Sequence, residues 1–159
     1  MFVRVRPMLE YEKRRSCKNC VTFGSGNDIT IQNTGDERTT WELDKVFKPC
    51  STAENLFQAI QDRVASVVDG HTVSIFAYGA LGTGKSHTMG HIIPQAVRVL
   101  FATKKRREEE THEIDISLAM SLMGIYNGRM RDLMDSRENY RGTETLKVRR
   151  GRNPLVYIQ

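Results

Sequence analysis

The stretch from Val73 to Met89 constrains the fold more than any other part of the chain. A run of apolar, β-branched and aromatic residues precedes a glycine-rich turn, and a helical pattern follows that turn. From Gly79 to Ser86 the turn carries the complete pattern G-x-x-x-x-G-K-S/T, which is typical of a phosphate-binding loop. A strand that leads through such a loop into a helix is expected in a parallel sheet, so we predict an α/β fold.

Each residue type in this loop suits an anionic ligand. Glycines permit backbone conformations in which successive N–H groups turn toward an anion. The lysine supplies a positive charge to the outer phosphates, and the serine opens a helix whose N-terminal dipole favours negative charge. The serine hydroxyl is also a candidate ligand of Mg²⁺. The candidate phosphate-binding residues are Gly79, Ala80, Leu81, Gly82, Thr83, Gly84, Lys85 and Ser86, with Ser86 as the metal ligand. The alternative, a chance match in a glycine-rich turn, is disfavoured by the strand-to-helix context.

Length and charge set broad limits. A chain of 159 residues is long enough for one domain with a buried core. Its net charge of +5 favours an acidic partner, which could be a nucleotide, a nucleic acid or an acidic protein surface. No apolar run approaches the ~20 residues of a membrane span. Arg4 and Arg6 interrupt the first apolar stretch, so no signal peptide is recognised and we expect a cytosolic protein without a membrane partner.

The three cysteines form no recognisable metal pattern. Cys17 and Cys20 make a C-x-x-C pair, and Cys50 stands alone. A zinc site needs a fourth ligand at suitable spacing, and the histidines supply none. Reduced thiols are therefore expected.

The region before the loop predicts strands and then one helix. Alternation from Phe2 to Arg6 indicates a strand that Pro7 ends, and Arg4 and Arg6 by themselves indicate a solvated strand face. Short β-rich runs between residues 20 and 47 predict an antiparallel meander with a last strand over 39–47. Ser51 and Glu54 form a capping box for a helix that Gly70 ends. Its predicted apolar face is Leu56, Phe57, Ile60, Val64, Val67 and Val68.

After the loop, a second helix is expected, interrupted at Gly90 and continued from Pro94. The charge run from Lys104 to Glu110 predicts a solvated helix end or loop rather than a nucleic-acid patch, because its acids offset its bases. Alternating apolar residues over 114–122 predict a strand, residues 129–134 predict one or two helical turns, and 146–148 and 155–158 predict a final hairpin. The predicted apolar face of the second helix is Ala96, Val97, Leu100 and Phe101.

Five segments together resemble the N-terminal part of a kinesin motor domain. Residues 3–7 (V-R-V-R-P) resemble its first strand, and residues 43–47 (L-D-K-V-F) resemble its F-D-x-V-F segment. Residues 67–79 resemble the S-x-x-D-G-x-N-x-x-I-F-A-Y-G segment that precedes the phosphate loop. Their sequence most resembles that of the minus-end-directed, C-terminal-motor (kinesin-14-like) class. Residues 92–96 (I-I-P-Q-A) resemble I-I-P-R-A, and residues 124–134 resemble E-I-Y-N-E-x-I-x-D-L-L. The matches keep their order across nearly the whole chain.

The resemblance implies a P-loop NTPase with a kinesin-like central sheet flanked by helices. It implies an ATP-driven motor of the cytoplasm and cytoskeleton whose partner is the microtubule, with no nucleic-acid partner. ATP or ADP with Mg²⁺ would occupy the loop. Arg4, Arg6 and Pro7 would lie beside the adenine, and His87 would stack near it.

The chain also departs from the family pattern. The family loop commonly reads G-Q-T-x-x-G-K-T, whereas this loop has Ala80, Leu81 and Ser86, so a polar contact near the phosphates is expected to be lost. The family's N-x-x-S-S-R and D-x-x-G switch motifs do not occur in residues 1–159, which are therefore expected to be a partial motor domain without most of the microtubule-binding surface.

Three hypotheses follow. The first is a kinesin ATPase of which this chain is a part, and the second is a non-catalytic, kinesin-derived nucleotide-binding or partner-binding module. The third is an unrelated P-loop protein or kinase, which the ordered matches disfavour. Phosphoryl transfer needs groups that position water and stabilise developing charge, so the chain alone is expected to show little microtubule-stimulated ATPase, and its catalytic residues are not assigned. An incomplete sheet would leave an unpaired edge and promote aggregation.

Overall fold

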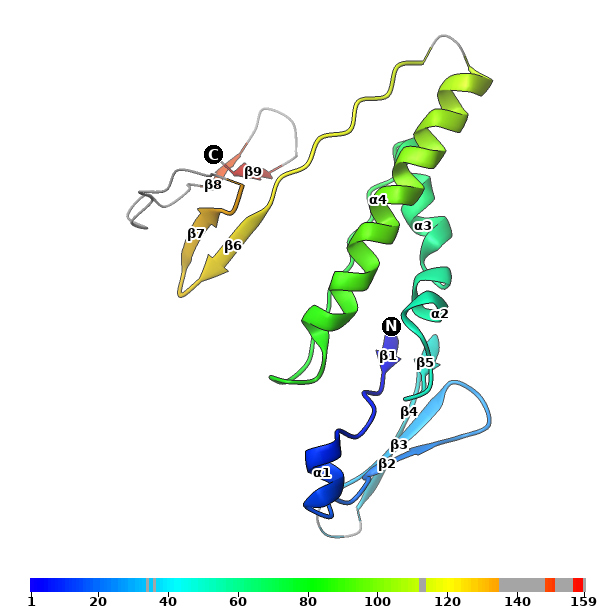
Figure 1. Ribbon diagram of the computed structural model, residues 1–159, viewed down its shortest axis with the longest axis vertical. Coiled ribbons are helices and arrows are strands. Elements are labelled where there is room, and N and C mark those ends of the chain that lie inside the picture. Colours follow the sequence, from blue (N-terminus) through cyan, green and yellow to red (C-terminus); the bar gives the residue numbers. More distant parts are fainter. Residues whose placement is uncertain (34, 36, 112–113, 135–147, 151–155, 159) are drawn as a thin grey trace. The chain divides into compact units, whose positions relative to one another are not determined.

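The computed structural model describes residues 1–33, 35, 37–111, 114–134, 148–150 and 156–158. The chain divides into two units, Met1–Ile116 and Ser117–Gln159, and each is described by itself. Figure 1 shows the first unit with its strands gathered toward the N-terminus and its longest helix, α4, beside two short helices. No helix among the described residues is both long and apolar enough to cross a membrane.

Two small sheets make up the strand-rich part of the first unit. Strand β1 (Phe2–Arg4) pairs in parallel with β5 (Lys45–Phe47), with Val3 opposite Val46. Strands β2 (Val21–Phe23), β3 (Asp28–Gln32) and β4 (Arg38–Glu42) form an antiparallel sheet in sequence order. The predicted meander is thus confirmed for β2 to β4.

The single last strand predicted over residues 39–47 is wrong. The chain leaves the antiparallel sheet after Glu42, and β5 joins β1 instead. Phe47 explains the break, because its side chain is only 3% exposed and belongs to the core formed by the helices. Because Phe47 is buried against the helices, residues 45–47 pair with β1 and do not continue β4.

The predicted helix over residues 51–69 is broken into three pieces: α2 (Ala53–Gln58), α3 (Gln61–Ala65) and the 3₁₀ helix η1 (Ser66–Asp69). The expected capping box is shifted by one residue, since Thr52 caps the helix and Asn55 reaches back to its backbone N–H at 3.0 Å. Ser51 lies one residue before the cap, and its N–H donates to the Lys48 carbonyl in the preceding turn. Gly70 ends η1 as predicted, with φ of +88°.

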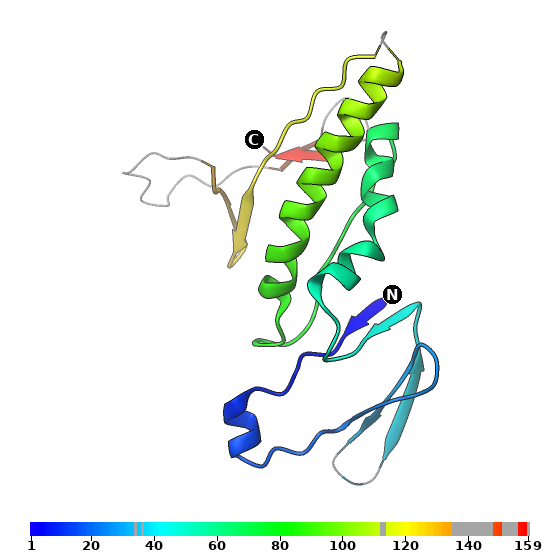
Figure 2. The same cartoon turned by 45° about the vertical axis from the view of Figure 1, so that its right-hand side comes forward.

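Helix α4 (Lys85–Glu110) runs without interruption through Gly90 and Pro94, so the predicted break is wrong. It lies side by side with α3 in both views (Figures 1 and 2), and packing along this face outweighs the local preference for a break. Of its predicted apolar face, Ala96 and Leu100 pack on the core, whereas Val97 and Phe101 are exposed. The buried core consists of Phe47, Leu56, Phe57, Ile60, Val64 and Ile92.

Two segments predicted as strands are not strands in the structure. Residues 73–78 and 114–122 form neither helix nor strand, and no described strand pairs with them. Phe76, in the first of these segments, is 89% exposed. Their apolar patterns are typical of strands, but a strand forms only where another strand accepts and donates its backbone hydrogen bonds.

The second unit contains two hairpins. Strand β6 (Met123–Tyr126) pairs antiparallel with β7 (Arg129–Asp132), so the helical turns predicted over 129–134 are wrong. Asn127 and Gly128 join these strands with φ of +50° and +71°, which suits an Asn-Gly hairpin turn. Strands β8 (Val148–Arg150) and β9 (Val156–Ile158) form the predicted final hairpin, although Leu146 and Leu155 lie outside the described residues.

Candidate functional site

The phosphate loop owes its shape to three glycines in conformations that other residues rarely adopt. Gly79, Gly82 and Gly84 have φ of +153°, +78° and +95°. Gly79 is required for space as well, since a Cβ there would lie 2.8 Å from the Thr83 Oγ1. That hydroxyl in turn donates to the Ala80 carbonyl at 2.8 Å, which closes the turn. The glycine positions of the sequence pattern are therefore structural requirements of the turn itself.

Lys85 lies over its own loop. Its ammonium donates to the carbonyls of Gly79 at 2.9 Å and Ala80 at 2.7 Å. The two acceptors fix the charge at the mouth of the turn without neutralising it, because both are uncharged. The loop thus presents a positive charge that no carboxylate offsets in the part of the chain that the structure describes.

The loop ends at the N-terminus of α4, with Gly84 as its left-handed cap residue. The first turn of this helix holds no acidic side chain. The first regular hydrogen bond of the helix runs from the Thr88 N–H to the Gly84 carbonyl at 2.9 Å, so the preceding N–H groups of the first turn have no acceptor within the helix. Ser86 is exposed in this turn, as a ligand of a bound cation must be. Free N–H groups and an uncompensated helix dipole favour an anion here.

Arg4 connects β1 to this helix. Its Nη1 donates to the Thr88 Oγ1 at 2.6 Å, across 84 positions of sequence. Thr88 is one helical turn beyond Lys85, so the end of β1 lies beside the first turn of α4. The structure therefore brings Arg4 beside the helix that begins at the phosphate loop.

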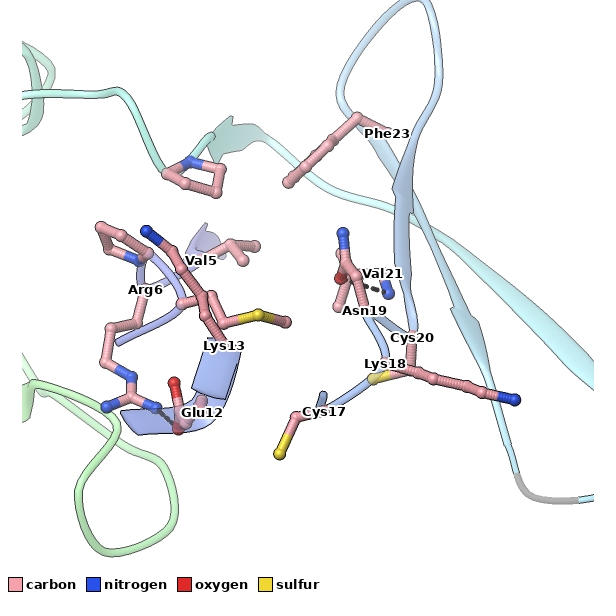
Figure 3. Close-up of a pocket in the computed structure, with 13 residues that line it drawn as sticks. Val5, Arg6, Glu12, Lys13, Cys17, Lys18, Asn19, Cys20, Val21 and Phe23 are labelled. Carbon is pink, nitrogen blue, oxygen red and sulfur yellow. Dashed lines mark hydrogen bonds and ion pairs between the residues drawn. The ribbon is translucent and has the colours of Figure 1, made fainter. Parts of the chain in front are cut away.

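Arg6 and Pro7 face a different neighbour. Arg6 forms an ion pair with Glu12 of α1 (Glu10–Arg14), and this hydrogen bond raises the pKa of the Arg6 guanidinium. The Leu9 N–H donates to Glu12 at 2.7 Å, and together with Arg6 it lowers the pKa of the Glu12 carboxyl. Figure 3 shows Arg6 and Glu12 on one side of a pocket of about 570 Å³, which Pro7 also lines.

His87 is exposed on the first turn of α4, where its ring meets that of His91 edge to face at 4.8 Å between centroids. No described hydrogen bond or ring contact joins His87 to Arg4, Arg6 or Pro7. The residues that sequence reasoning missed are Thr88 and Glu12, the partners of the two arginines. Glu12 lies six residues after Arg6 but follows no capping residue, since Leu9 has no side-chain oxygen, and nothing local indicates a partner as distant as Thr88.

Comparisons with known proteins agree with this arrangement. A family model described as the kinesin motor domain matches residues 4–159. The chain is 35% identical over 140 residues to Kinesin-like protein KIN-14T of Arabidopsis thaliana, a match that covers 84% of this chain and 15% of that protein. It is 33% identical over 156 residues to Kinesin-like protein KIN-14E of Oryza sativa subsp. japonica, covering 95% of this chain and 14% of that protein. Both names agree with the class that the approach to the loop predicted, and the chain spans only a small part of either relative.

Two solved structures share the fold. The motor domain of the Kar3-like kinesin from Ashbya gossypii matches with a TM-score of 0.74 at 24% identity, covering 99% of this chain and 50% of that chain. A KIF14 dimer in a two-heads-bound state, with AMP-PNP and in complex with a microtubule, matches with a TM-score of 0.86 at 26% identity, covering 99% and 47%. The predicted P-loop α/β fold is confirmed, and the chain spans about half of each solved chain.

Proposed function

Because the chain belongs to the kinesin motor domain family, we propose that it forms the ATP-binding part of a microtubule-based motor. In the complete domain, ATP hydrolysis would be coupled to movement along microtubules. The observation that supports this proposal most directly is the Lys85 ammonium, held over a glycine loop at the start of α4. We further propose that residues 1–159 are a partial motor domain and that the whole domain binds the microtubule.

In this proposal the loop from Gly79 to Ser86 binds the phosphates of ATP or ADP. The backbone N–H groups at the start of α4 donate to phosphate oxygens, and Lys85 adds its charge to the outer phosphates. Ser86 supplies a hydroxyl ligand to Mg²⁺, an ion that would neutralise charge on the phosphates when bound. The exposed hydroxyl and the absence of acidic side chains from the first turn of α4 fit this assignment.

The adenine would lie between the end of β1 and the first turn of α4. Arg4, Arg6 and Pro7 would contact it from β1 and the following residues, and His87 would stack near it from the helix. The hydrogen bond from Arg4 to Thr88 supports this placement, because it holds the end of β1 beside the first turn of α4, where the phosphate loop ends.

The loop assignment is tested by titrating a fluorescent ATP analogue with Mg²⁺ into the wild type and Lys85→Ala. We expect the variant to bind at least about tenfold more weakly, since a charge-assisted contact contributes about 1.5–3 kcal/mol. Lys105→Ala is the matched control, because Lys105 is exposed on the same helix and its nearest carboxylate lies 3.9 Å away. Equal affinity in the wild type and Lys85→Ala would contradict the proposal.

The adenine assignment is tested with His87→Ala, which we expect to weaken nucleotide binding while leaving the circular dichroism spectrum unchanged. Thr111→Ala, at the opposite end of α4, serves as the control. A nucleotide-bound structure with the base elsewhere would refute the assignment.

The second candidate is a non-catalytic nucleotide-binding or partner-binding module. The altered loop residues Ala80, Leu81 and Ser86 favour it over an active enzyme. Phosphate release by the 159-residue chain, with and without microtubules, tests our expectation of little stimulated turnover. Robust stimulation would show that catalytic groups lie within this chain and would exclude the module. A chimera that adds a downstream half with both family switch motifs should recover turnover if the chain is the ATP-binding part of a motor, and should stay inactive if it is a module.

A further inference from the structure

The pocket beside Arg6 contains two thiols that have no role in the proposed nucleotide site, although Arg6 and Pro7 belong to both. Residues 5–8 after β1, together with residues of α1 and β2, line it, and the C-x-x-C pair forms part of its wall (Figure 3). Cys17 and Cys20 are both exposed and both line the pocket. Cys50 is exposed as well but does not line it, which gives the chain an internal reference thiol.

The backbone holds both pocket thiols in place. The Cys17 N–H donates to the Glu12 carbonyl of α1 at 3.1 Å, and the Cys20 carbonyl accepts from the Gln32 N–H of β3 at 2.8 Å. The link between α1 and β2 is therefore anchored at each of its ends. Cys17 and Cys20 therefore line the pocket from a segment that backbone hydrogen bonds hold at both ends.

The charge of the pocket wall is positive. Its charged side chains are Arg6, Lys13, Lys18 and Glu12. Arg6 is paired with Glu12, and Lys13 is paired with Glu10 of α1 at 2.7 Å, so the net positive charge of the wall rests on Lys18. Lys18, between the two cysteines, makes no ion pair among the residues that the structure describes. Such a surface concentrates anions near the two thiols.

The rest of the wall is mainly apolar, and includes Val5, Pro7, Met8, Val21 and Phe23. Apolar surface next to positive charge fits a small organic anion with an aromatic or aliphatic body better than it fits a bare inorganic ion. A thiol reagent that is both anionic and partly apolar should therefore reach Cys17 and Cys20 more readily than it reaches Cys50.

We propose that this pocket is a thiol-modification site for small anionic disulfides, with Cys17 and Cys20 as the nucleophiles. In the reaction a cysteine thiolate attacks one sulfur of the disulfide R–S–S–R, and the S–S bond of the reagent breaks. A mixed disulfide, Cys–S–S–R, forms on the protein, and the other half leaves as the thiolate RS⁻. The cysteine proton passes to solvent, and no further oxidant is needed.

The test compares two disulfide reagents on three single-cysteine variants of the whole chain. Dithiobis(nitrobenzoate) is an aromatic dianion, dithiodipyridine is neutral, and both release a coloured product on reaction. The variants retain only Cys17, only Cys20 or only Cys50, with serine at the other two positions. The ratio of the anionic to the neutral rate constant is measured for each, and the circular dichroism spectrum checks that each variant is folded.

We expect this ratio to be about threefold to tenfold higher at Cys17 or Cys20 than at Cys50, because the pocket attracts the anion. Raising the ionic strength to about 1 M, where the Debye length is about 3 Å, should remove most of the difference. Lys18→Ala should lower the ratio at the pocket thiols, and Lys105→Ala should not. Equal ratios at all three cysteines, or a difference that survives both high salt and Lys18→Ala, would overturn the proposal.

Discussion

The helical layer and the segment that leads into the phosphate loop are both rich in apolar residues, but the structure treats them differently. Helices α2, α3 and α4 bury their apolar faces against one another, so that Phe57 is 2% exposed. Residues 73–78 are at least as apolar, and Phe76 is 89% exposed. A helix satisfies its backbone within its own length, whereas a strand depends on a partner elsewhere in the chain. Apolar composition therefore predicts burial only where the backbone's hydrogen bonds are also satisfied.

The largest test of this contrast compares two phenylalanines. Phe57→Ala removes a ring from the core of the helical layer and should lower the free energy of unfolding by about 3–5 kcal/mol. Phe76→Ala removes an exposed ring and should change it by less than about 0.5 kcal/mol. Urea unfolding followed by circular dichroism measures both. Comparable losses would mean that Phe76 is buried in solution by a partner that the described residues do not include.

A smaller change in the free energy of unfolding is expected at two glycines, one at the end of the phosphate loop and one within α4. Gly84 joins the loop to α4 with φ of +95°, so Gly84→Ala should destabilise the fold by about 1–2 kcal/mol. Gly90 lies within α4, and apart from its chain neighbours and the helix's own backbone no described atom lies within 4 Å of an added Cβ, so Gly90→Ala should stabilise the fold by about 0.5–1 kcal/mol. The same unfolding experiment measures the two variants, and effects of equal sign would contradict the structure.

The smallest effect concerns an extended segment whose backbone N–H donates a hydrogen bond to a side chain of α4. The Ile116 N–H donates to Glu108 at 3.0 Å, and Glu108 also pairs with Lys104. Lys104 first, and then the Ile116 N–H, lower the pKa of the Glu108 carboxyl. Its contribution to stability is therefore present above the ordinary glutamate pKa of about 4.3 and is lost as the pH falls through the lowered value.

Glu108→Gln should accordingly be less stable than the wild type at pH 6, with the difference disappearing toward pH 3. Urea midpoints at intervals across this range give the measurement. Glu109→Gln is the control, because Glu109 is 67% exposed and its lysine partner lies 3.9 Å away. A difference between Glu108→Gln and wild type that is constant with pH would show that shape, and not charge, is responsible.

Local signals in the sequence predicted the parts of the fold that depend on local physics. The glycine loop, the end of η1 at Gly70 and the buried residues from Leu56 to Val64 were all predictable. Asn127-Gly128 is itself a local signal for a hairpin turn, and the pairing of β7 with β6 across it excludes the helical turns predicted over 129–134. The break after Glu42 could not be predicted, because the burial of Phe47 among helices later in the chain decides it.

The same distinction holds for the candidate site. The loop pattern specifies Gly79 to Ser86 by itself, since the turn closes within a few residues. The partner of Arg4 lies 84 residues away, and the ion pair of Arg6 with Glu12 depends on how α1 folds back. The resemblance implied that both arginines lie beside one adenine, and their separate side-chain partners, Thr88 and Glu12, could not be predicted from local sequence.

The position of Lys85 has a consequence for the timing of ligand capture. A lysine side chain loses up to about 1.5–2 kcal/mol of conformational entropy when it is immobilised. Here the hydrogen bonds to the Gly79 and Ala80 carbonyls already restrict the Lys85 side chain, so this entropy is lost when the loop folds and not when the ligand binds. The Lys85 ammonium would therefore already be in position when a phosphate arrives. The rate of phosphate binding would then depend on diffusion and on access to the loop.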